Sequence, residues 1–66
     1  MKAVEYEALA LMLRRFETTE RSVLDSQHHG SVYLQYVEEE LFTPLRRVIE
    51  LVDTRAKQVK ESELTH

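Results

Sequence analysis

Residues 25–31, DSQHHGS, contain the only glycine of the chain and separate two halves with similar apolar patterns. Gly30 can adopt the left-handed conformation that ends a helix at no steric cost, and Ser31 can then cap the next helix. His28 and His29 fall in the last turn of the first helix, where the negative end of the macrodipole favours protonated imidazole. The stretch therefore predicts a turn at residues 28–31.

The half before this turn has the spacing of an amphipathic helix. Its apolar side chains recur three and four residues apart, at Leu9, Met12, Leu13, Phe16, Val23 and Leu24. Glu20 is the one charged residue on this face. Because the 66 residues include one glycine and one proline, few other breaks are available. We predict a helix at about residues 2–28 that buries this face.

The half after the turn repeats the pattern. Its apolar positions are Leu34, Val37, Leu41, Leu45, Val48, Val52, Ala56 and Val59. Thr43-Pro44 would suit the start of a separate helix, but the apolar register continues unbroken from Leu41 to Leu45. We therefore predict one helix at about residues 32–61, kinked or broken at Pro44, where proline removes a backbone hydrogen bond. Residues 62–66 lose the pattern and are expected to fray.

Two helices joined by a short turn form an antiparallel hairpin, so the predicted fold is all-α, with a single domain at residues 1–61. A hairpin has one seam, and a chain without cysteine has no disulfide to reinforce it. We expect two hairpins to dimerise into a four-helix bundle. The predicted self-association stripe is Val4, Ala8 and Leu11, which lie on the first helix away from Leu9 and Phe16.

Arginines from the two halves are predicted to form a band. Folding the chain about residues 29 and 30 brings Arg14 and Arg15 level with Arg46 and Arg47. Guanidinium groups bind phosphates or carboxylates in a bidentate manner, so the band is a candidate site for such ligands. The net charge of −3 and the lack of flanking lysines instead favour an ordinary solvated helix surface.

A second candidate surface is a stripe on the second helix, offset from its apolar face. It consists of Tyr33, Tyr36, Glu40, Arg47 and Leu51. Tyrosine and arginine often carry the binding energy of protein interfaces, which favours a partner-binding role. The alternative for Tyr33 is structural, with its ring covering the end of the core and its hydroxyl in water.

Catalytic and cofactor chemistry finds little support. A single glycine excludes the glycine-rich loops that cradle phosphates, and no cysteine is available as nucleophile or zinc ligand. His28 and His29 are adjacent, so on a helix they point about 100° apart and rarely share one metal ion. We predict no catalytic residue, metal or cofactor. The longest apolar run, residues 8–13, is shorter than the ~20 residues of a membrane helix, so we expect a soluble cytoplasmic protein that does not bind membranes.

These observations favour a small non-enzymatic protein-protein interaction module that acts as an adaptor, assembly subunit or inhibitor. Its expected partners are a second copy of the chain and another protein. The alternative is a nucleic-acid-binding regulator that uses the arginine band. The layout resembles that of Rop, an RNA-binding protein whose two-helix chains pair into a four-helix bundle, although no motif is shared and fold alone does not confer function.

Overall fold

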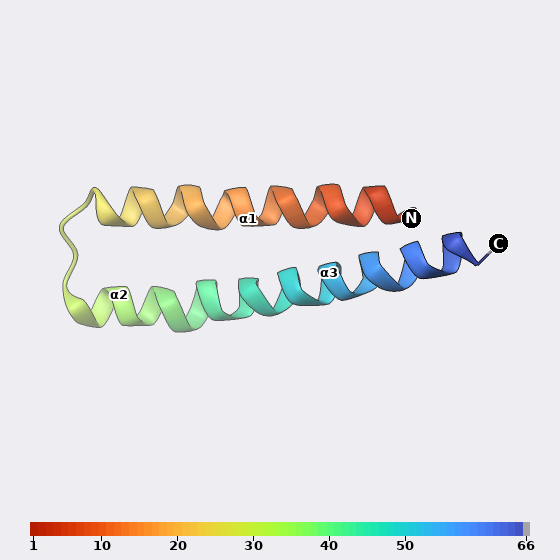
Figure 1. Ribbon diagram of the computed structural model, residues 1–66. Coiled ribbons are helices and arrows are strands. Elements are labelled where there is room, and N and C mark those ends of the chain that lie inside the picture. Colours follow the sequence, from red (N-terminus) through yellow and green to blue (C-terminus); the bar gives the residue numbers. More distant parts are fainter. Residues whose placement is uncertain (66) are drawn as a thin grey trace.

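The computed structural model describes residues 1–65 and consists of two long helical rods lying antiparallel (Figure 1). The first rod is α1 (Ala3–Asp25). The second contains α2 (Ser31–Val37), the π-helical turn η1 (Glu38–Phe42) and α3 (Thr43–Leu64). The Cα trace measures 53 × 17 × 12 Å, and both termini lie at the end opposite the turn (Figure 1). The predicted all-α hairpin is confirmed.

The turn between the rods differs from the predicted one. Helix α1 ends at Asp25, three residues early, where the Ser26 hydroxyl donates a 2.8 Å hydrogen bond to the Val23 carbonyl. Gly30 is extended, with φ −68° and ψ 155°, and is the N-cap of α2, so its predicted left-handed conformation is wrong. Ser31 is accordingly the first residue of α2 and not its cap. The loop at residues 26–30 is long enough to reverse the chain without a left-handed residue.

The two histidines lie in this loop and not in the last turn of α1. The His29 ring lies over the Tyr33 ring, with centroids 4.5 Å apart. Its Nε2 is 2.7 Å from the Gln27 amide oxygen. His29 therefore links the loop to the first turn of α2, which is a structural role.

Pro44 explains the π-helical turn. The second rod runs from Ser31 to Leu64 without a loop, and Pro44 lies in the first turn of α3. A proline ring clashes with the carbonyl of the residue four positions earlier, here Glu40. In η1 the Thr43 N–H bonds to the Glu38 carbonyl, five residues back, and this wider turn accommodates the proline.

The helix also continues to Leu64, past the predicted start of fraying at Ser62. Near its end the Glu63 carboxylate accepts a hydrogen bond of 3.1 Å from the Ala3 N–H. This contact satisfies one of the free donors at the start of α1 and joins the two ends of the hairpin. The predicted tail extends to His66, which lies outside the described residues.

The seam between the rods is narrow and uses small side chains. The buried apolar residues are Ala3, Ala10, Phe42, Ile49 and Ala56. Within each rod they recur at intervals of seven residues, the heptad spacing of packed helices. Alanine lets the two backbones approach closely. Ile49 fills the remaining space near the middle of the molecule, and Phe42 fills it closer to the turn, beside Leu24 and Leu34.

The predicted seam was partly wrong. Leu13, Leu24, Val37, Leu45, Val52, Ala56 and Val59 are buried or half-buried as predicted. Leu9, Met12, Phe16, Val23, Leu34, Leu41 and Val48 are exposed instead. The apolar face of α1 is wider than the strip that the second rod can cover. Apolar spacing alone did not show that the alanines at one edge of this face form the contact.

Enlarging a seam alanine should destabilise the hairpin. Ala10→Leu forces the rods apart at a residue that is 1% exposed, and we expect it to lower the free energy of unfolding by about 1–3 kcal/mol. Ala8→Leu makes the same change on the exposed side of α1 and should alter it by less than about 0.5 kcal/mol. Urea denaturation followed by circular dichroism measures both, and equal effects would show that Ala10 is not at a close contact.

Candidate functional site

Interhelical ion pairs gather on one flank of the seam, which we call the charged face. Lys60 Nζ lies 3.9 Å from Glu7 near the end of the hairpin opposite the turn, and Arg14 pairs with Asp53 in the middle of the hairpin. Further pairs follow toward the turn. The charged face therefore joins α1 to the second rod along most of its length.

Four of these side chains form a closed ring of ion pairs. Arg21 Nε lies 2.9 Å from Glu17, and its two terminal nitrogens lie 3.0 and 3.2 Å from the Glu38 carboxylate. Arg46 completes the ring, with Nε 3.1 Å from Glu17 and a terminal nitrogen 3.4 Å from Glu38. The Arg21 guanidinium also lies over the Phe42 ring, 4.1 Å from its centroid. Each charge in this quartet, which consists of Glu17, Arg21, Glu38 and Arg46, thus has two partners of opposite sign.

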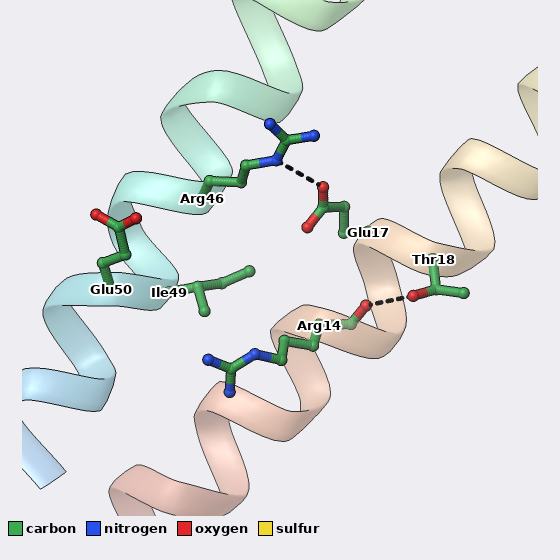
Figure 2. A pocket seen from close by; sticks show the side chains of 6 residues that line it. All are labelled: Arg14, Glu17, Thr18, Arg46, Ile49 and Glu50. Atoms are coloured by element: carbon green, nitrogen blue, oxygen red, sulfur yellow. Dashed lines mark hydrogen bonds and ion pairs between the residues drawn. The ribbon is translucent and has the colours of Figure 1, made fainter.

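A shallow hollow of about 320 Å³ lies beside this quartet on the charged face (Figure 2). It is lined by Arg14, Glu17, Thr18, Arg46, Ile49 and Glu50. Figure 2 shows Ile49 between the helices and Arg46 directed toward Glu17. The Thr18 hydroxyl donates to the Arg14 carbonyl at 3.0 Å, so the one hydroxyl of the hollow is already engaged.

The electrostatics of the hollow do not suit acid-base catalysis. Hydrogen bonds from Arg21 and then Arg46 hold the pKa of Glu17 below its ordinary value. Hydrogen bonds to Glu38 and to Asp53 raise the pKa values of Arg21 and Arg14 respectively. A general acid or base works best with a pKa near the operating pH, and these groups move away from it. The quartet is an ion-pair network that joins the rods.

The predicted arginine band is assembled only in part, because Arg14 and Arg46 line the same hollow whereas Arg15 and Arg47 do not. Arg14 lies opposite Asp53, seven residues or about 10 Å along α3 from Arg46. Arg46 lies opposite Glu17, so both of these arginines are neutralised by carboxylates. Arg15 and Arg47 are exposed and turned about 100° away from these paired neighbours. A fold about residues 29 and 30 would place position 45 opposite Arg14, but its partner Asp53 lies eight residues further along the second rod.

The predicted partner stripe is exposed on the second rod. Tyr36 and Leu51 are 63% and 69% exposed, and Glu40 and Arg47 are also exposed. Tyr33 is exposed as well, and its ring lies against the His29 ring of the loop. The structure therefore leaves the rest of this stripe available to a partner.

Two further sets of apolar side chains are exposed. The first is the predicted self-association stripe, Val4, Ala8 and Leu11 on α1. The second, which we call the apolar face, consists of Leu9, Met12, Phe16, Val23, Leu41 and Val48, with 36% to 66% of their area exposed. Apolar spacing identified these residues but assigned them to the seam. That they form an exposed surface becomes clear only when the structure shows which residues the seam buries.

No known protein family, curated protein or solved structure matches this chain. Within residues 1–65, no helix combines the length and apolar content needed to cross a lipid bilayer. The same part of the chain contains no group of three or more histidine, aspartate or glutamate side chains that could hold a metal ion.

The lowered pKa of Glu17 predicts a loss of stability in acid. Because its folded pKa lies below the unfolded value of about 4.3, its contribution is present above that pH and is lost as the pH falls through the folded pKa. We expect the melting temperature of the wild type to fall more steeply between about pH 5 and pH 3 than that of Glu17→Gln.

Glu50→Gln is the matched control, because Glu50 lines the same hollow but takes no part in the quartet. Its melting curve should keep the wild-type dependence on pH. Parallel profiles for the wild type and Glu17→Gln, measured by circular dichroism, would contradict the role given to the quartet.

Proposed function

We propose that the hairpin is a non-enzymatic protein-protein interaction module that works as a dimer, with two hairpins forming a four-helix bundle. Its exposed area supports this. The chain exposes 5344 Å², whereas a folded monomer of 7.8 kDa is expected to expose about 4,400 Å². The excess, roughly 1,000 Å², is close to the ~800 Å² that each partner contributes to a standard interface.

The predicted partner stripe, which we now call the outer stripe of the second rod, is the proposed contact for another protein. Tyr36 and Arg47 are residue types that are enriched among interface hot spots, and Glu40 and Leu51 lie beside them on the same stripe. A rigid rod presents such residues with little loss of conformational freedom on binding. The module would serve as an adaptor, assembly subunit or inhibitor. We also propose a cytoplasmic location, because a chain without cysteine needs no oxidising compartment.

The alternative of a nucleic-acid-binding regulator has less support. Arg14 and Arg46 are paired with carboxylates, so binding phosphates there would require breaking these ion pairs. Arg15 and Arg47 remain exposed. The two functions differ in salt dependence, because phosphate-driven binding weakens steeply as ionic strength rises.

Oligomeric state tests the dimer directly. We expect light scattering after gel filtration to give a mass of about twice 7.8 kDa. The melting temperature should rise over a hundredfold increase in protein concentration, because mass action favours the associated state. A monomer with a concentration-independent melting temperature would overturn the proposal.

Affinity capture tests the outer stripe. A protein partner should be recovered from lysate of the source organism equally well with and without nuclease, and at low or raised salt. Replacing both Tyr36 and Leu51 by alanine should reduce recovery at least tenfold, since interface anchors often contribute more than about 1 kcal/mol each. Alanine at Lys57 and Glu61, exposed on the same rod outside the stripe, is the matched control. Recovery of nucleic acid alone would favour the alternative.

A further inference from the structure

The apolar side chains exposed on the two rods have the spacing of a second packing surface. Leu9, Met12, Phe16 and Val23 on α1 are separated by three, four and seven residues. Leu41 and Val48 on the second rod are seven residues apart. This is the heptad spacing of a seam between packed helices, here repeated on both rods and left uncovered.

The ion pairs show that these side chains lie on one side of the hairpin. Successive residues of a helix are rotated by about 100°, so Arg14 and Leu9 lie on opposite flanks of the buried Ala10. On α3 the same rotation places Asp53 and Val48 on opposite flanks of Ile49.

Because Arg14 pairs with Asp53 across the rods, the flanks that carry them form one face of the hairpin. The opposite flanks, with Leu9 and Val48, must then form the other face. The hairpin as a whole is therefore amphipathic, with a charged face and an apolar face.

We infer that the apolar face is covered by a second copy of this chain, with the two hairpins meeting face to face; this rests on the dimer of the proposed function and identifies its interface. Two copies related by a twofold axis would each contribute two rods, and together they supply the four helices of a four-helix bundle. Both charged faces then remain in water, and their ion pairs need no desolvation.

The exposed area of the whole hairpin favours a second copy. The excess of roughly 1,000 Å² over a monomer of this mass matches one partner's share of a stable interface. The stripe of Val4, Ala8 and Leu11 is the competing surface, but it lies on one rod and one of its three members is alanine. The apolar face spans both rods and includes Met12 and Phe16, whose larger side chains bury more area.

Charge substitutions on the two surfaces separate them. Phe16→Glu combined with Val48→Glu should give a monomer at concentrations where the wild type is dimeric, because carboxylates would have to be desolvated in the interface. Val4→Glu combined with Leu11→Glu is the matched control and should remain dimeric. The reverse pattern would overturn the apolar face as interface while leaving the dimer intact. A monomeric wild type would overturn both.

A labelling experiment avoids variants that lose their fold on dissociation. The chain has no cysteine, so Met12→Cys and Leu11→Cys each introduce a single thiol, on neighbouring residues of different surfaces. Both positions are exposed in the isolated hairpin, at 66% and 50%. In the dimer the thiol at position 12 should react with maleimide at least tenfold more slowly than the thiol at position 11, and dilution should remove the difference. Equal rates in a dimer would contradict the inference.

Discussion

The close approach of two backbones at alanine is the contact on which the rest of this hairpin depends. Ala3, Ala10 and Ala56 are almost completely buried, although each has little area to bury. They stabilise the hairpin by letting the rods come near enough for the longer side chains on the charged face to reach across. The ion pair between Arg14 and Asp53 follows from this proximity. A larger residue at these positions would push the rods apart, which would open the seam and break the ion pairs across it.

The π-helical turn serves the same contact from the second rod. Pro44 disfavours a regular helical turn around Glu40, and the wider turn relieves the clash. Within that turn Phe42 enters the seam while Glu38 joins the charged face, so one local irregularity supplies both a buried ring and a member of the quartet. Arg21 contacts both residues and links the apolar and charged parts of the structure.

Because the seam is narrow, it leaves apolar side chains exposed that can take part in function. Alanine contacts bring the rods together without covering the wider apolar surface of α1, so Met12 and Phe16 remain exposed. Exposed apolar side chains that gather on one face are typical of an interface. The hollow on the charged face shows the opposite character, because its arginines are already paired with carboxylates. The contrast between the two faces supports the proposed role in association.

Local chemistry determined the helices, the antiparallel hairpin and the exclusion of cysteine-based or glycine-loop sites, because apolar spacing and the scarcity of glycine and proline act within short segments. The uninterrupted second rod could also be predicted, since the apolar register continues past Pro44. The seam could not, because Leu9 and Ala10 are adjacent and only the approach of the other rod decides which is buried. The register could not either: Arg14 faces Asp53 and not Arg46 because loop length and the π-helical turn set how the rods slide past each other. The charged and apolar faces exist only once the two rods have packed in this register, because each face is defined by the flank of the seam on which the ion pairs lie.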